Sequence, residues 1–172
     1  DLIETNMLFG IKILKYAECY GAKLFINLDT LLPKNLGKYA LSKSFFRDWL
    51  YQYSGELKIV NLRVEYIYGP NDSLEKLIPF VIKNINDREP TINLTSGKQK
   101  RDFIYVDDVI DSVCFILFKF ENFEIFNEFE IGTGKSTSIR KMLKMLVNEF
   151  EKRFGVTNTS LNFGKVPGRK NE

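Results

Sequence analysis

The segment "YALSK" places a tyrosine, Tyr39, four residues before a lysine, Lys43. If this segment is helical, the two side chains lie on one face of the helix, one turn apart. An ammonium group beside a phenol favours the phenolate and lowers a tyrosine pKa that is about 10 in water. Such a tyrosine can pass a proton to or from a hydroxyl or carbonyl group near neutral pH. The spacing is common on helices, however, and alone it also fits a structural role.

A second segment, "FEIGTGKSTSIRKML" at residues 129–143, contains the Gly-Lys-Ser of a phosphate-binding loop. A P-loop needs a first glycine five residues before the Gly-Lys pair, so that the backbone can wrap the phosphates. That position is Phe129, inside a run that predicts a strand. The loop is too short for an ATP-binding cradle and needs another explanation.

Composition excludes several classes of function. The chain has 172 residues, of which 44% are hydrophobic, so it can form one compact domain with a sizeable core. It has no histidine, which excludes Ser-His-Asp and Cys-His catalysis and argues against a zinc site, so no metal is expected. Its 25 basic and 22 acidic residues give no reason to expect nucleic acid as a partner.

No apolar run approaches the ~20 residues of a membrane span, so we expect no membrane segment and a cytoplasmic location. Cys19 and Cys114 match no metal-ligand spacing, and because both lie in apolar helical patterns we predict that they are buried thiols.

Apolar periodicity predicts helices that alternate with short buried strands. This alternation favours an α/β fold around a parallel sheet, with strands 23–28 and 57–63 adjacent and helix 39–53 crossing between them. The predicted helices are 3–20, 39–53, 73–85, one that starts near Asp107 or Asp108, and 138–153; the predicted strands are 23–28, 57–64, 91–95, 101–106, 124–131 and 160–164.

Five motifs together resemble the extended short-chain dehydrogenase/reductase family, the NAD-dependent sugar epimerases, dehydratases and reductases. "YALSK" matches its Tyr-x-x-x-Lys motif, and "ETNMLFGIKILKYAECYGAKLFIN" resembles its helix and strand around N-x-x-G-x-x-x-L. "LRVEYIYGPND" is similar to LRxxxxYGP, "RDFIYVDDVIDSV" to RDFxxVDDVxxA, and "FEIGTGKSTSI" to NIGsGxxxS. The resemblance covers nearly the whole chain in the family order. It identifies the Gly-Lys-Ser loop as a strand-to-helix turn.

The resemblance implies a role for four residues in catalysis. Tyr39 would be the general acid/base, and Lys43 would be its pKa partner, both of them also contacting the cofactor ribose region. Thr30, at the end of strand 23–28, would bond the same substrate oxygen as Tyr39. Asn6 would help to orient the lysine.

The resemblance also implies a division of the chain, its ligands and its assembly. Residues 1–70 would be the C-terminal part of an NAD(P)-binding Rossmann domain. Residues 71–172 would be mainly a small α/β substrate-binding portion, interleaved with the Rossmann sheet. Arg101 would grip the diphosphate of a nucleotide-sugar substrate and Tyr66 would also contact that substrate. The cofactor would be NAD or NADP, and the protein would be a homodimer.

Two departures from the family pattern limit these expectations. No Gly-rich cofactor loop occurs in the chain, and the family has it before the position of residue 1, so we expect a fragment that binds NAD poorly. Leu31 and Leu32 stand where the 4,6-dehydratases have Asp-Glu, which leaves an epimerase or a 4-ketosugar reductase. Residues 29–43 resemble the abequose and paratose synthases. The alternative is a non-catalytic binding or regulatory relative of the same fold.

Overall fold

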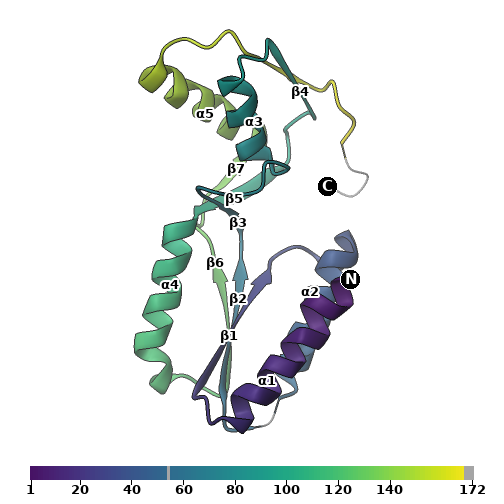
Figure 1. Cartoon of the computed structure of the whole chain (residues 1–172), viewed down its shortest axis with the longest axis vertical. Helices are drawn as coiled ribbons and strands as arrows, with labels where there is room; N and C mark the ends of the chain where they lie inside the picture. Colours follow the sequence, from purple (N-terminus) through teal and green to yellow (C-terminus); the bar gives the residue numbers. More distant parts are fainter. Residues whose placement is uncertain (54, 169–172) are drawn as a thin grey trace. The chain divides into compact units, whose positions relative to one another are not determined.

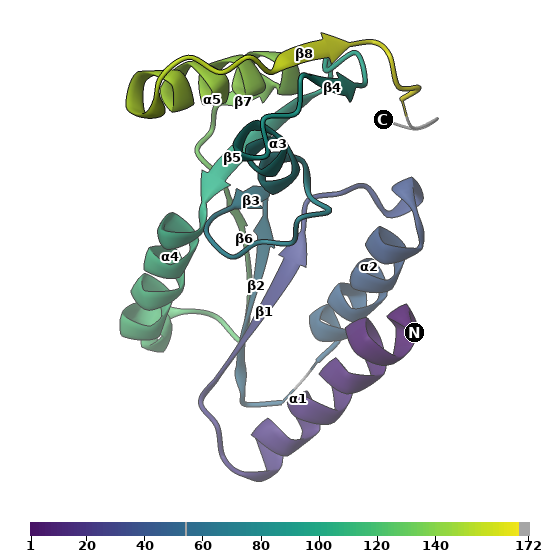
Figure 2. The same ribbon diagram turned by 45° about the horizontal axis from the view of Figure 1, so that its top comes forward.

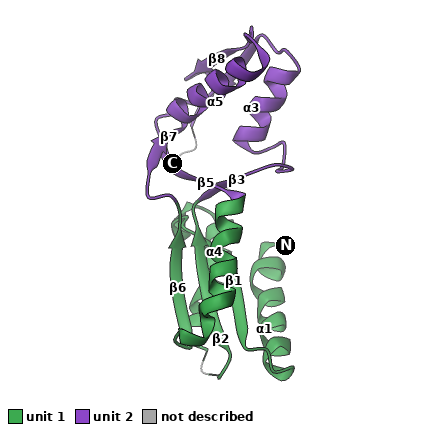
Figure 3. Ribbon diagram, turned by 90° about the vertical axis from the view of Figure 1, so that its left-hand side faces the viewer, with its two compact units in different colours: residues 1–65, 107–132 green, residues 66–106, 133–172 purple. Residues whose placement is uncertain are grey.

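A computed structural model describes residues 1–53 and 55–168 of the chain. These residues form two compact units, each built from two stretches of sequence (Figure 3). Unit 1 comprises residues 1–65 and 107–132, and unit 2 comprises residues 66–106 and 133–172. The two units therefore alternate along the sequence. The division of the chain into a cofactor-binding and a substrate-binding portion stays a prediction.

Unit 1 contains a three-stranded parallel sheet. Its strands are β1 (Leu24–Thr30), β2 (Lys58–Val64) and β6 (Phe126–Ile131), in the order β1-β2-β6. β1 and β2 pair in parallel from Leu24 opposite Lys58 to Thr30 opposite Val64, which confirms the predicted adjacency of these strands. Apolar residues occur on both faces of the sheet, as is typical of parallel sheets covered by helices on both sides.

Helices cover both faces of this sheet (Figure 1). The π-helical turn η1 (Glu4–Leu8), α1 (Phe9–Cys19) and α2 (Lys38–Tyr51) lie on one side, where Leu14, Phe46, Leu50, Leu57 and Ile59 form a core. α4 (Val106–Lys119) lies on the other side, where Ile116 packs on Val60 and Leu62. Two short 3-10 helices, η2 (Lys34–Leu36) and η3 (Phe120–Asn122), complete the unit.

Gly10 allows α1 and α2 to approach closely. A Cβ atom at this position would lie 2.6 Å from the Phe46 ring, closer than packed atoms can come. The ring of Phe46 therefore occupies the space that any other residue at position 10 would need.

The described part of unit 2, residues 66–106 and 133–168, forms two small sheets and two helices, whose arrangement can be followed in Figure 2. β5 (Lys100–Tyr105) pairs in parallel with β3 (Tyr66–Tyr68) and antiparallel with β7 (Ser136–Ser138), whereas β4 (Thr91–Leu94) pairs in parallel with β8 (Ser160–Phe163). α3 (Leu77–Asn86) and α5 (Ile139–Phe154) supply Val81, Ile85 and Leu143 to a core that also includes Ile92 and Leu94 of β4.

The observed elements differ from the sequence expectations in three ways. β3 and β7 were not predicted, because three residues are too few for an alternating pattern. α3 begins four residues later than predicted, since Lys76 has an extended backbone (φ −79°, ψ 152°). The prediction of buried thiols was wrong: Cys19 and Cys114 are both exposed. α4 is apolar around much of its circumference, and only one side of it faces the sheet.

The α1–α2 core predicts which substitution destabilises unit 1. Leu50 is fully buried. We expect Leu50→Ala to lower the free energy of unfolding by about 2–5 kcal/mol, because it removes apolar contacts and leaves a cavity. Leu117→Ala is the control, because this leucine of α4 is 52% exposed. Urea unfolding followed by circular dichroism measures both, and equal losses for the two variants would contradict the assigned core.

Candidate active site

Lys43 reaches from α2 to the carboxyl end of β1. Its Nζ atom donates a hydrogen bond to the backbone oxygen of Leu28 at 2.9 Å. Burial lowers the pKa of the Lys43 ammonium below its ordinary value, and the negative charge of Asp29 opposes this effect. Tyr39 lies one turn earlier on α2 and is 45% exposed. The helix thus carries both residues of the Tyr-x-x-x-Lys motif toward the end of a parallel sheet where ligands bind in open α/β folds.

Thr30 is the last residue of β1, two positions beyond the carbonyl that Lys43 holds. Its Oγ1 atom accepts a hydrogen bond from the backbone N–H of Leu32 at 3.2 Å, which shapes the turn after the strand. Thr30 and Lys43 therefore meet at the same strand end. A common contact of Thr30, Tyr39 and Lys43 with one substrate atom stays a prediction.

Asn6 contacts the serine that precedes Lys43. Its Nδ2 atom donates to Ser42 Oγ at 3.0 Å, and the Ser42 hydroxyl donates to the backbone oxygen of Tyr39 at 2.8 Å. This chain of hydrogen bonds ties the helix that begins the chain to the first turn of α2. Asn6 thus lies beside the Tyr39–Lys43 motif, and its predicted action on the lysine itself stays a prediction.

The spacing around Asn6 departs from the family pattern N-x-x-G. Three residues, Met7, Leu8 and Phe9, separate Asn6 from Gly10, whereas the pattern has two, so the match was inexact. The structure has a π-helical turn at Glu4–Leu8. A π-turn is the form that an α-helix takes when it accommodates one extra residue. The turn lets Asn6 face Ser42 while Gly10 faces Phe46.

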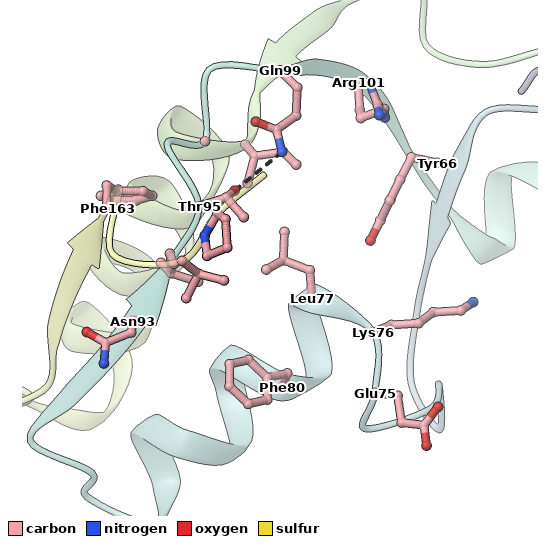
Figure 4. Close-up of a pocket in the computed structure, with 15 residues that line it drawn as sticks. Tyr66, Glu75, Lys76, Leu77, Phe80, Asn93, Thr95, Gln99, Arg101 and Phe163 are labelled. Carbon is pink, nitrogen blue, oxygen red and sulfur yellow. Dashed lines mark hydrogen bonds between the residues drawn. The ribbon is translucent and has the colours of Figure 1, made fainter. Parts of the chain in front are cut away.

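Unit 2 has its own hollow, of about 580 Å³, which is open to solvent (Figure 4). Arg101 and Tyr66, the two residues predicted to bind substrate, both line it. Burial raises the pKa of the Tyr66 phenol, with Lys76 and Arg101 acting in the opposite direction, so Tyr66 is a neutral hydrogen-bonding group. Polar, aromatic and aliphatic side chains line the hollow together with one acidic residue, Glu75; the polar and aromatic ones include Lys76, Phe80, Asn93, Thr95, Gln99 and Phe163.

Several of these lining residues were missed from the sequence. Lys76 precedes the first turn of α3 and pairs with Asp72 at 2.9 Å, an interaction that lowers the Asp72 pKa. Asn93 lies on β4, where Ile92 and Leu94 are buried and the intervening residues are exposed. This alternation was a readable signal that Asn93 faces away from the core. No comparable alternation in the sequence indicated that Phe163 of β8 lines the hollow.

The Gly-Thr-Gly-Lys-Ser loop holds a carboxylate of the chain itself. The Thr133 hydroxyl donates to Asp102 Oδ1, and the Gly134 N–H donates to Asp102 Oδ2 at 2.7 Å. Gly134 has φ +74°, a conformation that glycine adopts readily. Burial acts to raise the Asp102 pKa, but hydrogen bonds from Thr133, Gly134 and Lys135 outweigh it and lower the pKa below its ordinary value. The loop resembles a phosphate cradle because it binds an anion, and that anion is Asp102.

Within residues 1–53 and 55–168, no group of three or more Cys, Asp or Glu side chains is placed to hold a metal ion. Over the same residues, no helix combines the length and the apolar character needed to cross a membrane.

A parallel sheet with helices on both faces and a Tyr-x-x-x-Lys helix at its carboxyl end defines a Rossmann-like short-chain dehydrogenase/reductase. Residues 1–132 match the NAD dependent epimerase/dehydratase family, and the chain belongs to this family. The match confirms the predicted extended short-chain dehydrogenase/reductase family and the predicted α/β fold.

Individual relatives agree with this assignment. The chain is 30% identical over 180 residues to the CDP-abequose synthase of Salmonella typhimurium, covering 100% of this chain and 59% of that protein. It is 32% identical over 133 residues to the dTDP-D-glucose 4,6-dehydratase of Mus musculus, covering 76% and 37%. A UDP-glucose 4-epimerase from Thermotoga maritima, solved with UDP-glucose, has the same fold. Its TM-score to this chain is 0.79 at 22% sequence identity, and the match covers 98% of this chain and 58% of that one. The chain thus spans less than two thirds of the length of these relatives.

The Asp102 contacts predict a pH-dependent contribution to stability. Because the folded-state pKa of Asp102 is depressed, its contribution is present above the ordinary value of 3.8 and is lost as the pH falls through the folded-state pKa. We expect Asp102→Asn to lower the free energy of unfolding by about 1–3 kcal/mol at neutral pH. The difference from wild type should shrink below about pH 4. Urea unfolding between neutral pH and pH 3, with the exposed Asp111→Asn as control, checks this; a difference independent of pH would contradict the ionic role of Asp102.

Proposed function

We propose that the intact protein is an NAD(P)-dependent nucleotide-sugar epimerase or 4-ketosugar reductase. The observation that carries this proposal is the attachment of Lys43 to Leu28 O at the end of β1, with Tyr39 one turn away on the same helix. A partly desolvated ammonium one helical turn from a phenol supports acid–base chemistry by the tyrosine.

In this proposal, Tyr39 exchanges a proton with an oxygen of the sugar. Thr30 hydrogen-bonds the same oxygen from the end of β1. Lys43 stabilises the phenolate electrostatically and bonds the cofactor ribose, a role that suits its Nζ atom because an ammonium has two donors beyond the one given to Leu28 O. Bound NAD or NADP would take or supply the hydride at the carbon that carries this oxygen.

The hollow of unit 2 supports a nucleoside diphosphate as the part of the substrate that this unit holds. The guanidinium of Arg101 has donors for two phosphate oxygens at once. Tyr66, Asn93 and Gln99 add neutral hydrogen-bonding groups, and Phe80 adds an aromatic surface. The relatives' names carry CDP, dTDP and UDP sugars, which agrees with this class of ligand.

Within the family, we place the protein in the branch of the CDP-abequose synthases. The CDP-abequose synthases of two Salmonella species match 100% and 98% of the chain and that of Yersinia pseudotuberculosis 68%, whereas the dTDP-D-glucose 4,6-dehydratases of Mus musculus and Dictyostelium discoideum match 76% and 86%. Leu31 and Leu32 also lack the acidic side chains that the dehydratases use to eliminate water. Both observations favour net hydride transfer to a ketosugar.

We also propose a homodimer in the cytoplasm. Unit 1 exposes apolar side chains at helical spacing along α2, namely Leu41, Phe45 and Trp49, and others along α1, including Phe9 and Ile13. Such faces are typical of surfaces that another protein subunit covers.

The test of catalysis is Tyr39→Phe in the full-length protein. We expect turnover of the sugar nucleotide to fall by about 10²–10⁴-fold, because phenylalanine keeps the ring and lacks the transferable proton. Tyr51→Phe is the matched control, since Tyr51 lies on the same helix and is 67% exposed. Near-normal turnover by Tyr39→Phe would exclude Tyr39 as the acid/base. A wild-type protein that binds nucleotide sugars without turnover would favour the non-catalytic alternative.

The test of the substrate hollow is Arg101→Lys. We expect the affinity for CDP, UDP or dTDP to fall about ten-fold, since lysine keeps the charge and loses the paired donors. Titration calorimetry measures the binding, with the exposed Arg153→Lys on α5 as control. Unchanged affinity for every nucleotide would remove Arg101 from the diphosphate site.

A further inference from the structure

Asp29 is a carboxylate buried beneath the Tyr39–Lys43 motif. Its side chain in β1 is 0% exposed. Oδ2 accepts hydrogen bonds from Arg47 Nη1 at 2.8 Å and from Asn61 Nδ2 at 3.2 Å, and Oδ1 accepts from the backbone N–H of Thr30 at 2.7 Å. Burying a charged carboxylate is costly unless it is paired and hydrogen-bonded in this way. Three separate elements therefore meet at this one side chain.

Arg47 and Lys43 attach α2 to consecutive residues of β1. They are four residues apart, so they project from one face of the helix. Lys43 bonds the carbonyl of Leu28, and Arg47 bonds the side chain of Asp29. The next residue of the strand is Thr30. Two contacts one helical turn apart restrain both the position of α2 along β1 and its rotation about the helix axis, relative to the strand end that carries Thr30.

Asp29 also acts on Lys43 through its charge. Burial lowers the Lys43 pKa, and Asp29 is the charged group that raises it. Arg47 and Tyr39 come from the same helix as Lys43. Of the charges on neighbouring elements, Arg63 of β2 is paired with Glu128 and Glu130 of β6, and Glu4 of η1 is exposed and paired with Lys12.

We infer that Asp29 and Arg47 are positioning residues: their ion pair fixes α2 on the carboxyl end of β1, and the charge of the Asp29 carboxylate holds the Lys43 ammonium at Leu28 O, one helical turn from Tyr39. The catalytic consequence rests on the proposed function, whereas the effect on Lys43 does not. The simpler alternative is an ion pair that only stabilises the packing of α2 on the sheet.

The Lys43 pKa separates these two possibilities. Asp29→Asn keeps an oxygen that can accept from Arg47, so α2 stays attached while the opposing charge is removed, and the Lys43 pKa should fall further below its wild-type value. If the ion pair only stabilised the packing of α2, Asp29→Asn would loosen the helix, hydrate the Lys43 ammonium and raise its pKa toward the ordinary value of 10.5. The two outcomes have opposite signs.

The measurement uses the full-length protein with its lysines reductively methylated by ¹³C-formaldehyde. The Lys43 signal is assigned by its absence from Lys43→Arg and followed by NMR as a function of pH. Glu130→Gln is the matched control. This variant also removes a carboxylate that pairs with an arginine, Arg63. Glu130 lies in the same row of the sheet as Asp29 but two strands away, so the backbones of the two residues are about 10 Å apart. We expect the Lys43 pKa to be unchanged in this control.

A second pair of variants covers the case in which Asp29→Asn does not fold. Arg47→Gln leaves the Asp29 charge uncompensated, and adding Asp29→Asn to it should then lower the Lys43 pKa relative to Arg47→Gln alone. An unchanged or higher pKa on removal of Asp29, in either background, would overturn the inference.

Kinetics test the catalytic consequence. We expect kcat of Asp29→Asn to fall about ten-fold, a part of what general acid–base groups contribute, with KM for the nucleotide sugar unchanged. A proportional change in KM with kcat unaffected would contradict positioning of the reacting groups. If the wild-type protein turns over no nucleotide sugar, the proposed function fails, and the Lys43 pKa still decides whether Asp29 and Arg47 position Lys43.

Discussion

The attachment of α2 to the carboxyl end of β1 is the contact on which the candidate active site depends. Parallel strands all end at one edge of the sheet, so a helix that follows β1 can present its first turns at that edge only if it is held there. The Lys43–Leu28 and Arg47–Asp29 bonds hold it. On an adjacent face of α2, Asn6 bonds Ser42 and restrains the same turn. The first two turns of α2 are therefore restrained from the strand and from η1.

The face of the sheet that α2 covers is apolar at one end and polar in the next row of residues. Phe25, Ile59 and Phe126 pack in the apolar core at one end, and Asn27, Asn61 and Glu128 form the next row on that face, in register across the three strands. Asn61 donates to Glu128 at 2.7 Å and accepts from Asn27 at 2.7 Å. Since a slip of one residue would turn these polar side chains toward α4, the row specifies the register of the sheet. It also begins the polar environment that continues to Asp29 and Arg47.

Unit 2 also fixes a loop through a buried carboxylate, that of Asp102 in β5. Asp102 occupies the donors of the Gly-Thr-Gly-Lys-Ser loop, which fixes that loop on β5. The adjacent residue of β5, Arg101, lines the hollow that we assign to a nucleoside diphosphate. Along a strand, successive side chains point to opposite faces, so Asp102 anchors the loop on one face while Arg101 lines the hollow on the other.

The sequence alone determined the α/β class, most helices and strands of both units, and the Tyr39–Lys43 pair, because helical and strand spacing are set by local backbone geometry. It also indicated Arg101 and Tyr66 through a family resemblance. Only the tertiary structure decided that Asn6 bonds Ser42, that Cys114 is exposed, and that Lys76 and Phe163 share a hollow. It alone revealed Asp29 as a buried partner of Arg47. Such relations join residues far apart in the chain, and they exist only once the packing of whole elements has selected which faces meet.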